Sequence, residues 1–359
     1  MMLARFCDEV IIMSGSGRNA LIICASVLAI AALYFARSVF APAAVSLFAV
    51  AVVWPVQKWL EERLPQLIAL AITLLLTVFV LSALLALSVW GIGQVGRWMI
   101  INAAQVQAFY VQLTQWLESH GIFVVGIFLD RFDVAWLVRP AQGLASTVRT
   151  LVAFALLVLV FMMLALLEVR DFKAKLQTAC PEEFASRILR ASKLVAEKFR
   201  RYMVIRTIAS AATGLMVALL CWALGVELAA GWGVLAFVLN FIPFIGPFVA
   251  TVLPALFAIV QFQSWEAATL IFAGVSLIQF LIGSYLEPRL SGSALSISPF
   301  LVVFAVFFAA LLWGIPGAFM GVPLAIAVLT LLEQYTSTAW IAELLSGTPA
   351  HSKRIGPDR

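Results

Sequence analysis

The sequence has 359 residues, of which 64% are hydrophobic and 11% are charged, and its formal net charge is +5. A soluble domain is about half apolar and about a quarter charged, so this composition excludes a water-soluble fold. A spanning helix uses about 20 apolar residues. The sequence therefore predicts an all-α polytopic membrane protein with about eight hydrophobic segments.

Six of these segments are expected to be ordinary spans. In chain order they cover residues 19–36, a run that ends near residue 54, and residues 67–90, about 151–167, 207–224 and 267–285. The first run resembles a signal peptide, but no small-residue cleavage site follows it, and it is interpreted as a retained anchor. Residues 1–92 then form an N-terminal three-span region, and residues 149–168 form the fourth span.

The distribution of Lys and Arg predicts the orientation of these spans. Ten basic residues lie between residues 169 and 206, whereas residues 93–148 contain only Arg97, Arg131 and Arg139. Basic flanks stay in the cytoplasm, so residues 93–148 are expected to form a periplasmic arm. Because successive spans cross the membrane in alternating directions, the N-terminus is then expected in the cytoplasm. The C-terminus is expected there too, as a tail at residues 341–359.

Both water-facing segments have helical patterns. In the arm, Trp98, Tyr110 and Trp116 are candidate anchors at the membrane interface. In residues 169–206, apolar residues recur every three or four positions opposite a basic face, which indicates an amphipathic helix. This helix lies either on the anionic inner leaflet or against a partner or gate.

The region 207–340 contains two apolar segments that prolines and glycines interrupt. Residues 230–262 are broken at Asn240, Pro243, Gly246 and Pro247, and residues 299–332 are broken at Pro316 and Gly317. Proline ends a helix, and freed backbone groups cannot face lipid. If each segment enters the membrane and returns to the side from which it came, the sequence predicts two re-entrant hairpins of opposite orientation. The alternative is that these are ordinary spans, because single prolines are common in membrane helices.

Transporters often bind solute where broken helices of inverted repeats meet, so region 207–340 is the expected transport core. Acidic residues avoid the span centres, and the deeper polar groups, such as Asn240 and Gln279, suit a neutral solute. The motif Glu287-Pro288-Arg289 is either a latching or gating charge pair or an ordinary interfacial loop. The candidate binding or gating residues are Asn240, Pro243, Gly246, Pro247, Gln279, Glu287, Pro288, Arg289, Pro316 and Gly317.

Residues that build catalytic or metal centres are scarce. His120 and His351 are the two histidines, and the four cysteines form no C-x-x-C pair. A G-x-x-x-x-G-K-[ST] phosphate loop is also missing from the sequence. The sequence therefore predicts no enzyme activity, no cofactor and no metal site, and no nucleic-acid partner.

Four sequence stretches resemble the autoinducer-2 exporter family of bacterial inner-membrane proteins. They are Trp54 to Glu61, Asn240-Phe241-Ile242-Pro243-Phe244-Ile245-Gly246-Pro247, Glu287-Pro288-Arg289-Leu290-Ser291-Gly292-Ser293, and Ser298-Pro299-Phe300 to Pro323. The resemblance covers about residues 19 to 340. It implies inner-membrane export of a small molecule such as autoinducer-2 by a homo-oligomer, with a pentamer as the first expectation. Sodium/proton antiport, described for some relatives, is the alternative and would depend on Glu287.

Overall fold

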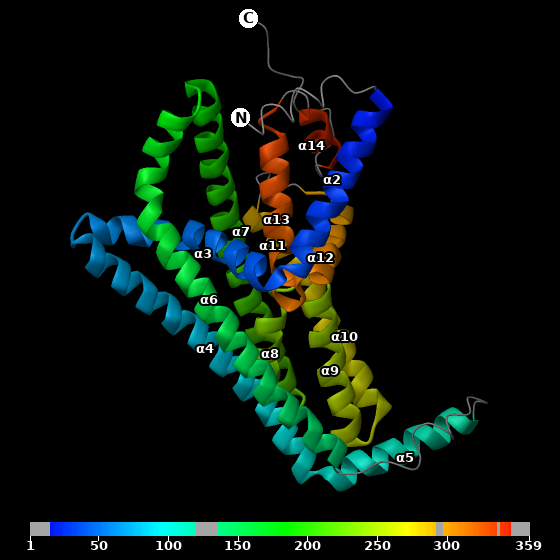
Figure 1. The fold of residues 1–359 in the computed structure, drawn as a ribbon. Coiled ribbons are helices and arrows are strands. Elements are labelled where there is room, and N and C mark those ends of the chain that lie inside the picture. The colour runs from blue at the N-terminus through cyan, green and yellow to red at the C-terminus, as the bar shows by residue number, and fades with distance from the viewer. Residues whose placement is uncertain (1–14, 120–134, 292–296, 336–337, 346–359) are drawn as a thin grey trace, which may run out of the picture.

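The computed structural model describes residues 15–119, 135–291, 297–335 and 338–345, and the elements in these residues are helices (Figure 1). Seven of the described helices are long and apolar enough to cross a membrane. Many of their large apolar side chains are exposed, as expected for surfaces that contact lipid. The all-α polytopic membrane fold is confirmed.

The N-terminal part consists of α2 (Gly15–Phe35), α3 (Arg37–Glu61) and α4 (Gln66–Ile101). Helix α4 is longer than the predicted span and continues into the predicted arm. Helix α5 (Ala103–Ser119) follows it, and residues 120–134 of the arm lie outside the described residues. Residues 1–14, residues 292–293 of the family-like stretch that begins at Glu287, and residues 346–359 of the predicted tail also lie outside the described residues.

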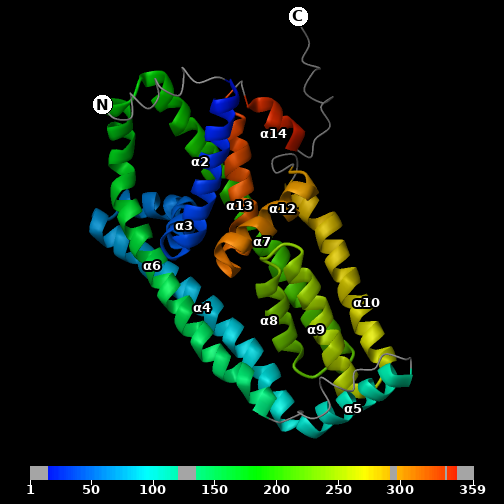
Figure 2. The same cartoon turned by 45° about the vertical axis from the view of Figure 1, so that its right-hand side comes forward.

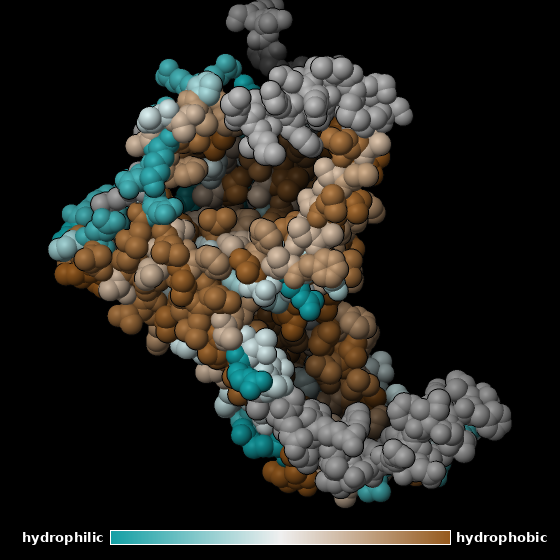
Figure 3. All heavy atoms as spheres, viewed as in Figure 1, coloured by the Kyte–Doolittle hydropathy of each residue, from teal (hydrophilic) through white to brown (hydrophobic). Residues whose placement is uncertain are grey.

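Two long helices follow, α6 (Ala135–Ala179) and α7 (Glu182–Ala223). The 45 residues of α6 extend over about 68 Å at 1.5 Å per residue, more than twice the thickness of a hydrocarbon core. The predicted boundaries after residues 148, 168 and 206 therefore fall inside continuous helices. In Figure 3 hydrophilic side chains gather at the upper ends of α6 and α7, whereas apolar ones cover much of the visible face below.

Both interrupted segments fold as helical hairpins. The first hairpin consists of α8 (Ala229–Leu239) and α9 (Ile245–Phe262), and the second of α12 (Pro299–Trp313) and α13 (Ile315–Leu332). Figures 1 and 2 show that the tip of the first points up and the tip of the second points down, so that the two tips meet near the middle of the molecule. The predicted opposite orientation of the hairpins is present in the fold.

The segment between the hairpins is one nearly continuous helix. It consists of α10 (Trp265–Leu281), a π-helical turn η2 (Ile282–Leu286) and α11 (Glu287–Ser291). The sequence predicted a span that ends at residue 285, but the helix continues through Pro288 to Ser291. In the π turn the N–H of Glu287 donates to the carbonyl of Ile282, five residues back, and such wider turns accommodate local irregularity within a helix. A last short helix, α14 (Ala339–Leu345), follows the second hairpin.

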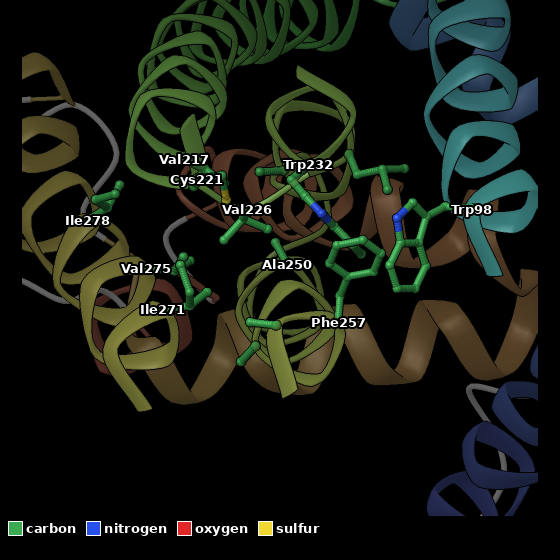
Figure 4. Close-up of a cluster of buried hydrophobic side chains, with 14 of the residues drawn as sticks. Trp98, Val217, Cys221, Val226, Trp232, Ala250, Phe257, Ile271, Val275 and Ile278 are labelled. Atoms are coloured by element: carbon green, nitrogen blue, oxygen red, sulfur yellow. The ribbon is translucent and has the colours of Figure 1, made fainter. Parts of the chain in front are cut away.

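The largest buried cluster holds α7, the first hairpin and α10 together. Figure 4 shows Val217, Trp232, Phe257 and Val275, from α7, α8, α9 and α10, converging with Trp98 from the end of α4. A separate cluster around Met162 of α6 joins α3, α4 and α6. The first hairpin and α7 therefore belong to one packed unit, to which the end of α4 is attached.

Candidate functional site

A polar stripe runs along the face of α7 that meets the hairpins. We define the α7 polar stripe as Tyr202, Arg206, Ser210 and Thr213, which recur at helical spacings of four, four and three residues. Ser210 and Thr213 are fully buried and Arg206 is only 8% exposed. Buried polar groups are costly without partners, so the contacts of this stripe identify the place where the transport core is polar.

The tip of the first hairpin attaches to this stripe through Asn240. The Asn240 side-chain amide, which is 2% exposed, donates from Nδ2 to Ser210 Oγ at 3.2 Å. The sequence predicted Asn240 as a binding or gating residue, and the partner that its side chain has in the structure is a hydroxyl on α7. Asn240 therefore fixes the position of the tip on α7.

Part of the backbone freed by the break is hydrogen-bonded within the hairpin itself. The N–H of Ile242 donates to Leu239 O and that of Gly246 donates to Ile242 O, each at 2.9 Å. Pro243 and Pro247 have no N–H, so they add no donor that needs an acceptor. These bonds lower the cost of irregular backbone in a membrane protein, where freed polar groups cannot face lipid.

Gly246 and Gly317 have the same structural role in the two hairpins. A β-carbon on Gly246 would overlap with the carbonyl oxygen of Leu239, and one on Gly317 with that of Ala309. The two arms of each hairpin therefore cross at backbone contact distance. Pro316 lies in the first turn of α13, where a missing N–H has no cost. These three predicted site residues shape the hairpins.

The charged contact of the site joins α7 to α11. Arg206 Nη1 donates to Glu287 Oε1 at 2.6 Å, with 10% of the Arg206 side chain and 29% of the Glu287 side chain exposed. The sequence suggested Arg289 as the charged neighbour of Glu287, but Arg289 and Pro288 are exposed. The partner of Glu287 is thus Arg206, 81 residues earlier. Sequence reasoning counted Arg206 only as one of ten cytoplasmic basic residues.

An apolar contact between the two hairpin tips borders the polar stripe. Val306, Ala318, Val322 and Ile326 of the second hairpin form a buried cluster, and Ile242 and Ile245 of the first tip pack against it together with Tyr202. The Phe241 and Phe319 rings lie 6.0 Å apart between centroids. The site is therefore polar on the side of α7 and apolar where the tips touch.

Gln279 lies on α10, two helical turns before Glu287. Its Nε2 is buried and has no hydrogen-bond acceptor among the described residues. No recorded contact links Gln279 to the α7 polar stripe within the described part of the chain, so it lies apart from the other candidates. Of the predicted site residues, Asn240 and Glu287 contact the stripe directly.

The base of the first hairpin is held by a second set of hydrogen bonds. Trp98 Nε1 donates to the Glu227 carboxylate, and Gln261 accepts from the Glu227 N–H and donates to Gly225 O, both at 2.9 Å. The Trp98 ring also packs on Phe257, with 4.3 Å between centroids (Figure 4). The interpretation of Trp98 as an interface anchor is wrong, and the side chains of Tyr110 and Trp116 lie outside the described part.

The basic amphipathic helix is the N-terminal half of α7. Part of its apolar side is covered by protein, because Ala185, Ala191 and Phe199 are at most 3% exposed and the Phe199 ring packs on Phe48 of α3 at 4.7 Å. Lys198 also pairs with Glu333, just after α13, at 3.0 Å. Packing against α3 and the second hairpin therefore accounts for much of the pattern that suggested a lipid-bound helix.

The sequence is similar to a family of transporters and to individual transport proteins. Residues 23–337 match the family described as AI-2E family transporter. The chain is 32% identical over 321 residues to the AI-2 transport protein TqsA of Escherichia coli K12, covering 87% of this chain and 90% of TqsA. It is 28% identical over 344 residues to a Haemophilus influenzae protein named for transport, covering 91% and 96% of the two chains.

Proposed function

We propose that this chain, which belongs to the AI-2E family of membrane transporters, exports small and mostly neutral polar molecules of the autoinducer-2 kind. The observation that carries the proposal is the meeting of two opposed hairpins at the α7 polar stripe. Opposed broken helices are the arrangement in which secondary transporters hold their solutes. Since Arg206 and Glu287 neutralise one another, the site offers hydrogen bonds without a net charge.

We further propose an inner-membrane protein with both termini in the cytoplasm and a homo-oligomeric assembly, with a pentamer as the first expectation. The orientation is supported by the ten basic residues between positions 169 and 206, and the assembly by the family resemblance. Neither the description of the matched family nor the name of TqsA supports sodium/proton antiport. The carboxylate on which it depended, Glu287, is engaged with Arg206.

Export is tested with purified protein reconstituted into vesicles loaded with autoinducer-2. We expect wild-type protein to release the solute faster than empty vesicles do. Asn240→Ala should slow release while the protein still inserts, because the first tip loses its hydrogen bond to Ser210, worth about 0.5–1.5 kcal/mol. The measurement is the rate of solute appearance outside the vesicles.

The matched control is Gln105→Ala, which removes an exposed amide on α5 and should leave release unchanged. Pro243→Ala tests the same tip without touching the Asn240 side chain. Release at the wild-type rate in both Asn240→Ala and Pro243→Ala would remove the hairpin site from the mechanism. Equal leakage from wild-type and empty vesicles would reject autoinducer-2 as the solute.

A further inference from the structure

The guanidinium of Arg206 is bound by protein on one side only. Nη1 contacts a single oxygen of Glu287, although arginine and carboxylate groups frequently form two parallel bonds. Its Nε is buried and has no acceptor among the described residues. The resting structure therefore holds a charged, buried donor without an acceptor, which native proteins seldom leave without a reason.

Arg206 also lies on α7 between the contacts that the two hairpins make with it. One turn further along α7, Ser210 accepts the hydrogen bond of Asn240 from the first tip. One turn earlier, Tyr202 packs with the cluster that joins both tips. A ligand held by Arg206 would therefore be in reach of both hairpins, which is the position that a transported solute has to occupy.

The ion pair is open on the side of Glu287. The Glu287 side chain is 29% exposed, against 10% for Arg206. The π turn that precedes Glu287 has open space at Gly283, where an added β-carbon would meet no atom within 4 Å. Single π turns within helices are frequent at functional sites. Glu287 is thus the more exposed partner, and a small molecule that reaches the pair would meet Glu287 first.

We propose that Arg206 binds the solute directly, through two neighbouring hydroxyl or carbonyl oxygens, and that Glu287 occupies part of this donor set until the solute arrives. The inference rests on the proposed transport function and names the chemistry of its solute site. A planar guanidinium presents paired N–H groups that match two adjacent oxygens. A neutral solute is favoured because Glu287 already balances the charge of Arg206.

Two substitutions at the ion pair are expected to differ in their effect on affinity. Arg206→Lys keeps the charge opposite Glu287 but removes the planar donor pair, so binding of autoinducer-2 should weaken by about tenfold or more, the usual effect of losing a hydrogen bond from a charged donor. Glu287→Gln removes the charged competitor, so affinity should be kept or improved while release slows. Isothermal titration of the purified proteins measures both.

Lys198→Gln is the matched control, because it breaks a different ion pair between α7 and the second half of the chain, the one with Glu333, and should not change affinity. If the Arg206–Glu287 pair is merely structural, its loss should lower the thermal stability of both variants. The affinity of the folded fraction should then stay at the wild-type value. Equal affinity of wild type and Arg206→Lys would therefore overturn the proposal, even where transport of autoinducer-2 is established.

A second measurement keeps the proposal testable without any variant. Phenylglyoxal modifies guanidinium groups, and peptide mass spectrometry follows its reaction with Arg206 and with the exposed Arg289 in the wild-type protein. Autoinducer-2, D-ribose and glycerol all carry neighbouring oxygens, and at least one of them should protect Arg206 but not Arg289. Protection by ribose or glycerol alone would reject autoinducer-2 but support the Arg206 site, and no protection by any of the three would overturn it.

Discussion

Replacing Gly317 by valine is expected to leave little or no folded protein in the membrane. A β-carbon at this position would overlap with the carbonyl oxygen of Ala309 in the other arm of the second hairpin. Backbone atoms on both sides cannot move apart without opening the hairpin. The expected loss is about 4 kcal/mol or more, which is the range of severe single substitutions. Gly246→Val should act in the same way on the first hairpin.

The measurement is the monodisperse fraction of a fluorescent fusion on size-exclusion chromatography, followed by its thermal midpoint. Gly93→Ala and Gly96→Ala are the controls, because added β-carbons there meet no atom within 4 Å. Alanine at such helical positions should be neutral or stabilising by about 0.5–1 kcal/mol. A Gly317→Val protein as monodisperse and as heat-stable as these controls would contradict the packing described here.

The hairpins themselves were predictable from sequence. Pro243, Gly246 and Pro247 lie within five residues, and such a cluster interrupts a helix. Helix α8 accordingly ends at Leu239, and helix α9 begins at Ile245. The boundaries at residues 148, 168 and 206 were not predictable in this way. From Leu144 to Cys180 the sequence contains neither proline nor glycine, and a change from apolar to charged residues does not end a helix.

The contacts of the site depend on tertiary structure, which local sequence patterns do not specify. Asn240 and Glu287 were candidates, but their partners Ser210 and Arg206 lie 30 and 81 residues away. One signal was present and went unused: Tyr202, Arg206, Ser210 and Thr213 share one helical face. A polar stripe on a helix that is otherwise apolar after residue 206 marks a buried contact.

The two hairpins are held in physically different ways. The first hairpin is fixed by directional bonds to α7 at its tip and to the loop after α7 at its base, where Trp98 of α4 also bonds to that loop. Helices α7 and α8 approach so closely that a β-carbon on Gly233 would lie 2.6 Å from Gly214 O. Close packing of small residues stabilises helix pairs in membranes. The two tips, in contrast, touch through aliphatic and phenyl groups. Apolar contacts are non-directional, so this interface is the easiest place for the core to open.

Joining the two tips covalently is therefore expected to stop transport. Phe241 and Phe319 face one another across the tips with ring centroids 6.0 Å apart, and cysteines at both positions should be bridged by a short thiol cross-linker. If the tips have to separate for the solute to pass the α7 polar stripe, release of autoinducer-2 from vesicles should fall to the level of empty vesicles. Cleaving a reducible cross-linker should restore it.

Each single variant, Phe241→Cys or Phe319→Cys, treated with the same reagent is the matched control, because it carries the same label without the bridge. These controls also account for the native cysteines, of which Cys24 is exposed. Because the cross-link joins residues that already touch, it should not disturb folding, and the thermal midpoint checks this. Undiminished release from fully cross-linked protein would mean that the two hairpins move as one body. The path that opens for the solute would then have to lie between the hairpins and α10 or α4.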